Sequence, residues 1–394
     1  MIITNRANCG AARGIPEDAA ALDESRRARS ESNALSVLIL DGESPYALSI
    51  ARCLAAARVV RTHVLSSWRW APVRFSRSIE SFHSWSGFKG VLASEECSNV
   101  AREVGADLCL ATDEVGIEFT VRQGSWLSVP SVAVPSLDSL QLTLDKWALA
   151  RFLVANGLPH PTTELASHCA GSSVRSAALR FPVLLKPRSG GNGFGIRRFD
   201  GLRALDESLE VDNSRERAIV QTEITGYDID CSVLCRDGEV LAYTIQKGFA
   251  ASVGFGPPGA IEFVDDSDVI DVVRRLMAAL RWNGVAHVDL RYDDVTGAVN
   301  IIEINPRFWG SVLGSLHAGI NFPYLACLSA LGRPFAAPYY RTCRYVGGAT
   351  ALGYWKRGRF ARSSTGFSFT DTLFWYARHD PVPTLIEPFQ KKRL

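Results

Sequence analysis

Short apolar runs alternate with helical periodicity over the first third of the chain. The run Ser36–Leu40 is followed by a turn at Asp41-Gly42, and residues 47–60 then place apolar side chains on one helical face. Buried strands that alternate with helices are typical of a parallel open sheet, so we expect a βα region over residues 34–135. Three more short apolar runs predict the next strands of this sheet: 63–65, 90–92 and 108–110.

A mixed order of helices and strands follows and predicts an α+β region over residues 136–335. The expected elements are helices over 144–156 and 268–280, strands over 181–187 and 218–221, and two hairpins, 229–245 and 285–305. Two segments lie outside these regions. Residues 1–33 mix charges and carry little apolar surface, so we expect a disordered tail. Residues 336–394 are basic and aromatic, and their pattern indicates no role.

Composition excludes several classes of protein. The 394 residues carry 43 Lys and Arg against 41 Asp and Glu, a net charge of +2 that argues against a nucleic-acid binder. No apolar run reaches the length of about 18 residues that a membrane span needs. The nine cysteines are dispersed, and we interpret them as reduced thiols of a cytoplasmic protein. Composition therefore excludes fibrous, membrane and disulfide-framework proteins, and it leaves the chemistry to the motifs.

The hairpin over 285–305 carries the strongest chemical signal. On alternating strands, Asp289 shares a face with His287, and Glu303 shares a face with Asn305. A turn symmetric about Thr296 would make Asp289 and Glu303 direct cross-strand partners, whereas a bulge in the turn would break that pairing. Two carboxylates so close share either a proton or a cation, and the amide oxygen of Asn305 favours Mg²⁺. An ordinary solvated strand face remains the alternative.

A second signal lies at the end of the predicted strand over 181–187. Lys186 ends an apolar run, where an ammonium group is costly without an anion beside it. The glycine-rich turn over 189–195 follows directly, and glycines let backbone N–H groups approach phosphate oxygens. The turn matches neither a Walker A loop nor a dinucleotide fingerprint. The alternatives are therefore a phosphate-binding loop and a plain flexible hairpin.

Four motifs in this order resemble an ATP-grasp ligase. They are Asp-Lys146 at the start of a helix, Phe-Pro-Val-Leu-Leu-Lys186-Pro with its glycine loop, Gln221-x-Glu-Ile-x-Gly, and Glu303-Ile-Asn-Pro-Arg307. Residues 305–311 and 317–323 are similar to the group related to the carbamoyl-phosphate synthase large subunit. The resemblance implies a Rossmann-like pre-ATP-grasp domain, α/β in class, followed by an ATP-grasp fold, α+β in class.

The resemblance also implies a role for each matching position. Lys146 and Lys186 would contact the nucleotide phosphates, and Arg307 would stabilise the phosphoryl group in transfer. Asp228 would bind the ribose hydroxyls, a role for which Asp230 competes. Adenine would lie against Gln221, Glu223 and Ile224. The mobile loop over the γ-phosphate would contain Gly190, Gly191, Gly193 and Gly195. Mg²⁺ would be bound by Asp289, Glu303 and Asn305.

This set of residues implies an ATP-dependent carboxylate–amine ligase. ATP would convert a small carboxylate to an acyl phosphate, which an amine then attacks with release of phosphate. Two alternatives remain: an enzyme that activates bicarbonate or another acid without an amine, and a non-catalytic nucleotide-binding protein. Expected partners are small-molecule substrates, with neither nucleic acid nor membrane, and the resemblance allows a homodimer.

Overall fold

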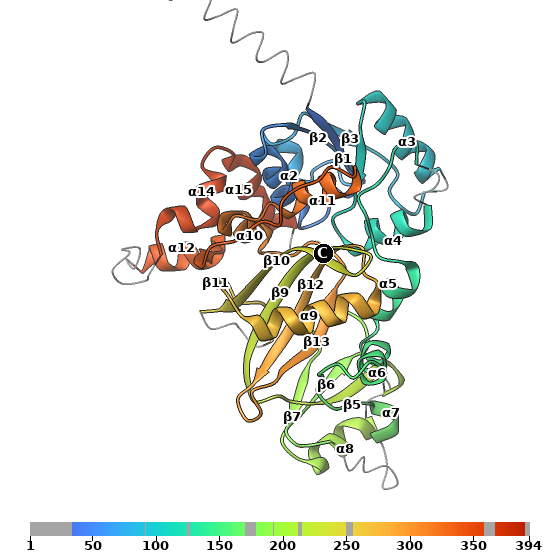
Figure 1. Cartoon of the computed structure of the whole chain (residues 1–394), viewed down its shortest axis with the longest axis vertical. Helices are drawn as coiled ribbons and strands as arrows, with labels where there is room; N and C mark the ends of the chain where they lie inside the picture. The colour runs from blue at the N-terminus through green and yellow to red at the C-terminus, as the bar shows by residue number, and fades with distance from the viewer. Residues whose placement is uncertain are drawn as a thin grey trace, which may run out of the picture.

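The computed structural model describes residues 34–90, 92–123, 127–169, 179–191, 193–211, 215–249, 255–357 and 367–390. The tail expected over 1–33 lies outside the described residues. Three sheets follow one another along the long axis of the molecule, with the N-terminal sheet at the top and the smallest sheet at the bottom (Figure 1). The largest sheet lies between them, and it carries most of the candidate site.

The N-terminal sheet is parallel, with strand order β3-β2-β1-β4, as the βα pattern predicts. The strand expected over 90–92 is wrong. Gly90 lies in a bend, Leu92 caps a helix, and Val91 is outside the described residues. The third strand is instead a half-buried edge strand, whose polar residues give little hydrophobic signal. The elements are β1 (Leu35–Ile39), α2 (Ala47–Ala56), β2 (Val60–Ser66), β3 (Ser81–Ser84), α3 (Ala93–Glu103), β4 (Leu108–Leu110) and α4 (Glu114–Gln123).

The smallest sheet is antiparallel, with strand order β5-β8-β6-β7. The glycine-rich turn connects two of its strands, so the sheet presents this turn toward the middle of the molecule. A small apolar core beneath the strands supports this sheet. The elements are α5 (Leu137–Leu144), α6 (Lys146–Ala155), β5 (Thr163–Leu165), α7 (Ala166–Cys169), β6 (Val183–Pro187), β7 (Arg197–Phe199), α8 (Leu202–Val211) and β8 (Ala218–Thr222).

The middle sheet has six antiparallel strands in the order β13-β12-β9-β10-β11-β14. Helix α9 (Ser267–Leu280) covers one face and closes a large apolar core, in which Cys231 and Cys235 are buried free thiols (Figure 1). The alternate residues of the same strands face the N-terminal region. The strands are β9 (Gly226–Arg236), β10 (Glu239–Gly248), β11 (Ala260–Val264), β12 (Gly284–Asp293), β13 (Val299–Asn305) and β14 (Cys343–Val346).

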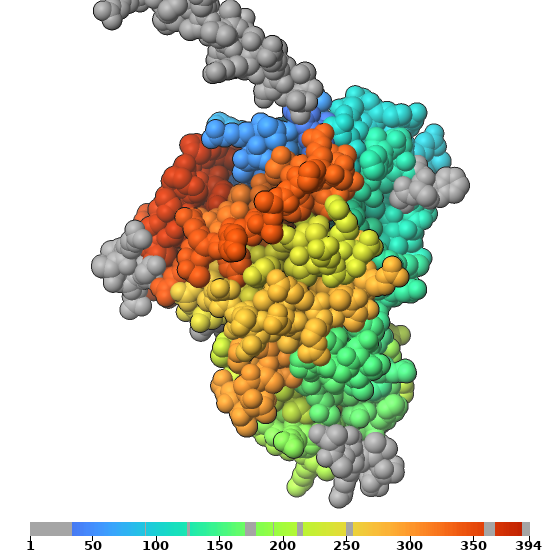
Figure 2. Space-filling model, in the orientation of Figure 1, coloured from blue at the N-terminus to red at the C-terminus, as the bar shows by residue number. Residues whose placement is uncertain are grey.

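The C-terminal residues return to the N-terminal region, and their helices lie beside it in the space-filling view (Figure 2). Strand β14 extends the middle sheet, and Arg52 of α2 forms a buried ion pair with Asp380 at 3.2 Å. Segments from the two ends of the chain therefore pack together. The helices that follow β13 are α10 (Val312–Ala318), α11 (Phe322–Ala330), α12 (Gly348–Lys356), α14 (Leu373–Ala377) and α15 (Pro381–Gln390).

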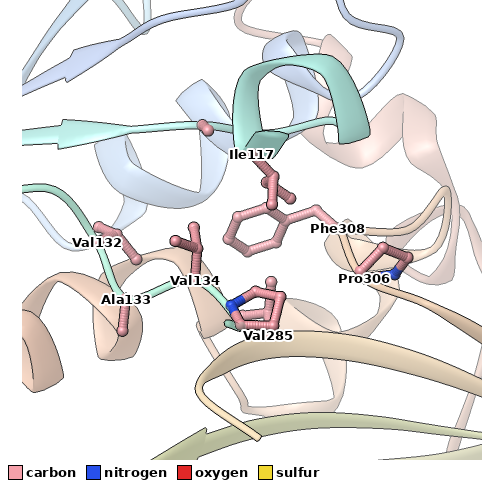
Figure 3. A pocket seen from close by; sticks show the side chains of 9 residues that line it. Ile117, Val132, Ala133, Val134, Val285, Pro306 and Phe308 are labelled. Carbon is pink, nitrogen blue, oxygen red and sulfur yellow. The ribbon is translucent and has the colours of Figure 1, made fainter. Parts of the chain in front are cut away.

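Apolar contacts join the N-terminal sheet to the end of β13. The ring of Phe308 lies in a small hollow between Ile117 of α4 and the side chains of Val132, Val134 and Val285 (Figure 3). These contacts bring the first turn of α4 close to the residues that follow β13. The N-terminal region thus faces the candidate site directly.

Candidate active site

The hairpin of β12 and β13 pairs Asp289 with Glu303, as expected from the sequence. The register of the turn is not symmetric about Thr296, because Leu290 lies opposite Ile301 and Arg291 opposite Asn300. A bulge at Ile302 shifts the register by one residue and restores the pairing. A bulge was expected to separate the two carboxylates; here it brings them together.

A third carboxylate lies in the same row. Asp230 of β9 pairs with Asp289 from the other side, so three adjacent strands each contribute one acidic residue. The carboxylates of Asp230 and Asp289, with His287, lie close enough to hold one metal ion. From the sequence, Asp230 was expected only as an alternative to Asp228 in binding the ribose hydroxyls. The alternation of Asp228 and Asp230 was visible in the sequence, but the pairing of β9 with β12 was not.

The electrostatics of this row suit a cation. Desolvation raises the pKa of Asp230 to about 7, and desolvation with the neighbouring carboxylates of Asp230 and Glu303 raises that of Asp289 well above its usual range. Asn305 Nδ2 donates to Asp289 Oδ2 at 3.3 Å, which leaves its amide oxygen on the same face. Carboxylate and amide oxygens are the donor set that Mg²⁺ prefers, so these residues fit the ion.

His287 lies beside this row on the same face. Its Nε2 is 3.4 Å from Asp289 Oδ1, its Nδ1 is 2.9 Å from Ser232 Oγ, and its ring stacks on Trp309. Burial, and to a smaller extent the positive charge of Arg307, lower the pKa of His287 to about 3. The imidazole is therefore neutral at physiological pH. A neutral imidazole adds no charge to the row of carboxylates.

Two lysines face the acidic row, Lys146 from the start of α6 and Lys186 from β6 of the smallest sheet. Lys146 Nζ donates to Glu303 Oε1 at 3.2 Å and to the Gly190 carbonyl at 2.5 Å. Lys186 Nζ donates to Gln221 Oε1 at 2.7 Å, and burial lowers the pKa of Lys186 to about 8. The structure therefore brings together the two lysines that the sequence singled out, on the side of Glu303.

The glycine-rich turn passes over the acidic row. A Cβ on Gly191 would lie 3.7 Å from Glu303 Oε1 and 4.0 Å from Asn305 Oδ1. Gly193 has a φ of +72°, and a Cβ there would lie 2.3 Å from the carbonyl oxygen of Phe255, so only glycine allows this approach. Gly190 and Gly195 also have positive φ angles, whereas residue 192 is outside the described part of the chain.

The residues expected around adenine and ribose already have partners within the protein. The Gln221 side chain binds Lys186 and Thr163, and Glu223 pairs with Arg198. Arg291 donates to the Ile224 and Gly226 carbonyls and to Asp228 Oδ1. These contacts fix the segment that connects β8 to β9. The Gln221 side chain thus orients Lys186, a contact that the sequence did not indicate.

Arg307 lies between the acidic row and the N-terminal region. Its Nη2 donates to Asn305 Oδ1 at 3.2 Å and its Nη1 to the Phe308 carbonyl at 3.0 Å. The side chain is nine-tenths buried. Cationic groups therefore face the metal-ligand candidates from two sides: Lys146 and Lys186 from one, and Arg307 from the other.

Comparison with known proteins identifies the central part of the chain. A family model described as "ATP-grasp domain" matches residues 143–311. The chain contains an ATP-grasp domain. A D-alanine–D-alanine ligase of Mycobacterium sp. (strain KMS) is 28% identical over 219 residues, which cover 46% of this chain and 56% of that protein. The carbamoyl phosphate synthase large chain of Archaeoglobus fulgidus is 26% identical, over 44% of this chain and 17% of that protein.

A solved structure shows the same fold over a longer region. The N5-carboxyaminoimidazole synthetase of Staphylococcus aureus, complexed with ADP, superposes with a TM-score of 0.64 and 13% identity over 82% of this chain and 86% of that one. A Rossmann-like N-terminal region followed by an ATP-grasp fold is thus confirmed. The chain spans little more than half the length of the first curated relative. All the lysine, carboxylate and arginine residues of the site lie within or beside the ATP-grasp domain.

Proposed function

We propose that this protein is an ATP-dependent carboxylate–amine ligase. The observation that carries the proposal is the row of Asp230, Asp289 and Glu303 on three adjacent strands, with Lys146 and Lys186 facing it. Carboxylates that bind a cation, opposite ammonium groups that bind phosphates, form the arrangement that phosphoryl transfer from ATP needs. The similarity to a D-alanine–D-alanine ligase supports an amine as the acceptor.

The chain's residues divide the work of nucleotide binding. Lys146 and Lys186 would bind the phosphates, and the backbone N–H groups of Gly190, Gly191, Gly193 and Gly195 would close over them. Adenine would lie against the segment of Gln221, Glu223 and Ile224, with Asp228 toward the ribose. Arg291 holds this segment in place through the carbonyl groups that it binds.

The chemical step would take place between the acidic row and Arg307. Asp289, Glu303 and Asn305 would bind one or two Mg²⁺ ions, with Asp230 beside them. Bound there, Mg²⁺ supplies positive charge that stabilises the phosphoryl oxygens. Arg307 would stabilise the same oxygens from the opposite side while the substrate carboxylate accepts the phosphoryl group. The amine then displaces phosphate from this acyl phosphate, and the glycine loop keeps water from it.

The expected partners remain small molecules. Among the described residues no helix is long and apolar enough to cross a membrane. We propose a cytoplasmic protein that acts on a small carboxylate and an amine or amino acid, and a homodimer stays a prediction.

The decisive experiment measures ADP release with panels of carboxylates and amines in the presence of Mg²⁺. ADP release that requires both an acid and an amine supports the ligase, and mass spectrometry would identify the amide product. ADP release that requires only bicarbonate or an acid would instead support the first alternative. Nucleotide binding without turnover in any panel would support the second.

A further inference from the structure

The guanidinium group of Arg307 has partners in the N-terminal region as well as in the ATP-grasp domain. Its Nε is 3.3 Å from Glu114 Oε1 and 3.6 Å from Asp113 Oδ1, and both acids lie at the start of α4. Its Cζ lies 4.7 Å from the centre of the Tyr46 ring, which precedes α2. Tyr46 follows β1, and the two acids follow β4, its neighbour in the parallel sheet.

These contacts leave the guanidinium with little freedom. The Phe308 carbonyl and Asn305 each accept from one terminal nitrogen, the acids bind Nε, and the Tyr46 ring covers one face of the plane. Each terminal nitrogen keeps a second N–H that can reach a phosphoryl oxygen, and the planar cation can rotate only if several of its present partners are lost together. The rotation of the Arg307 side chain is therefore limited from both sides of the site.

The turn that carries the two acids is itself rigidly held. The buried carboxylate of Asp41 accepts hydrogen bonds from the backbone N–H groups of Thr112 and Asp113 and from the Thr112 hydroxyl. Asp113 in turn accepts from the Glu114 N–H at 2.8 Å. A contact needed only for docking two regions would not require this support, because the apolar contacts of Phe308 already join them.

We propose that Asp113, Glu114 and Tyr46 are positioning residues, which hold the Arg307 guanidinium in the orientation that stabilises the transferred phosphoryl group. The proposal rests on the proposed function, since it assumes that Arg307 acts on that group. It gives the N-terminal region a part in the first chemical step. Partial burial raises the pKa of both acids, and Arg307 opposes that rise, as expected for carboxylates paired with one cation.

The test uses Asp113→Asn and Glu114→Gln, singly and together, in the full-length protein. We expect ADP release to fall about tenfold for Glu114→Gln and about a hundredfold for the double variant, while the dissociation constant of MgADP stays within about twofold. Glu114→Asp should recover part of the loss. Glu118→Gln, one turn further along α4, is the matched control, because Glu118 pairs with Arg122 on the helix surface.

A second comparison separates positioning from a general structural role. In an Arg307→Lys background the same acid substitutions should cause almost no further loss, because the group that they orient is gone. Equal losses in both backgrounds would overturn the proposal, as would unchanged ADP release in the double variant. Melting temperatures near that of the wild type show that the variants fold.

Failure of the proposed function is recognised separately. If the wild type releases no ADP with any substrate, the same variants are compared by the gain in MgADP affinity that aluminium fluoride, a mimic of the transferred phosphoryl group, produces. Positioning predicts that this gain falls about tenfold in the double variant and in Arg307→Lys alike. No loss in the double variant, or no gain in the wild type, would overturn the positioning role.

Discussion

The two faces of the middle sheet are built from the same strands, but one face carries apolar side chains and the other carries acidic ones. Toward α9, residues such as Val288, Leu290 and Cys231 are completely buried in an apolar core. Toward the N-terminal region, the alternate residues Asp289 and Asp230 bring carboxylates side by side. Because side chains alternate along a strand, one backbone supports both faces.

The apolar face explains how the chain can tolerate a row of acidic residues on the other face. Neighbouring carboxylates repel one another and lose hydration, which opposes folding. The apolar face of the same strands contributes burial that stabilises the sheet. The site face is thus free to be selected for ligand binding, and substitutions on the two faces should affect different properties of the protein.

The largest expected effect is on the acidic face. Glu303→Gln should lower ADP formation by about 10³-fold, because an amide cannot supply the negative charge that a bound cation needs. The melting temperature should stay within a few degrees of the wild type, since glutamine keeps the size of the side chain. Glu239→Gln, at the exposed start of β10, is the control. Near-normal turnover of Glu303→Gln would show that the metal assignment is wrong.

The apolar face should show the opposite result. Leu290 is 1% exposed, and Leu290→Ala should lower the free energy of unfolding by about 3 kcal/mol, as for other buried leucines. ADP formation per folded molecule should change less than about twofold. Chemical denaturation measures the first quantity. Leu385→Ala, at a residue that is 72% exposed, should change stability by less than about 0.5 kcal/mol. A large loss of activity in Leu290→Ala would contradict the separation of the two faces.

The sequence predicts local pairing better than it predicts distant contacts. Asp289 and Glu303 could be paired in advance because one short turn connects their strands and alternation fixes which residues share a face. The bulge at Ile302 was not predicted, because it depends on how β12 and β13 fit the rest of the sheet. The edge strand β3 was missed for a related reason, since its half-buried residues are not strongly apolar.

Contacts between regions far apart in the chain could not be predicted. Asp230 joins the acidic row only because β9 pairs with β12, and Glu114 reaches Arg307 only because the N-terminal sheet packs against the end of β13. Motif reasoning placed Lys186 near phosphates, but the bond from Gln221 depends on the pairing of β6 with β8. Each of these residues is polar, so no hydrophobic pattern indicated its partner.

A moderate effect is expected from pH, through Lys186. Burial lowers its pKa to about 8, below the value near 10.5 of an exposed lysine, so the free protein loses this charge as the pH rises above 8. Phosphates beside the ammonium favour its charged form, and binding then takes up a proton. The dissociation constant of MgADP should therefore rise by up to about tenfold per pH unit above pH 8 and stay flat below it.

Calorimetry at several pH values measures this slope. Lys186→Arg should bind without the break near pH 8, and a break that persists in that variant would assign it to another group.

The smallest effect tests the cost of the acidic row itself. In wild-type protein without Mg²⁺, Asp230 has its pKa raised to about 7, so its ionised form opposes folding as the pH rises from about 4 through 7. Asp230→Asn removes that charge, keeps the size of the side chain, and leaves an oxygen to accept from Gln246. We expect the free energy of unfolding at pH 8 to increase by about 1 kcal/mol without Mg²⁺, and the increase to vanish at pH 4.

Saturating Mg²⁺ should stabilise the wild type more than the Asp230→Asn variant, because the bound ion has one carboxylate fewer beside it in the variant. A variant less stable than the wild type at pH 8 would mean that the hydrogen bond from Gln246 to Asp230 outweighs the cost of burying the Asp230 charge. The two faces of the sheet would then differ less than their charges suggest.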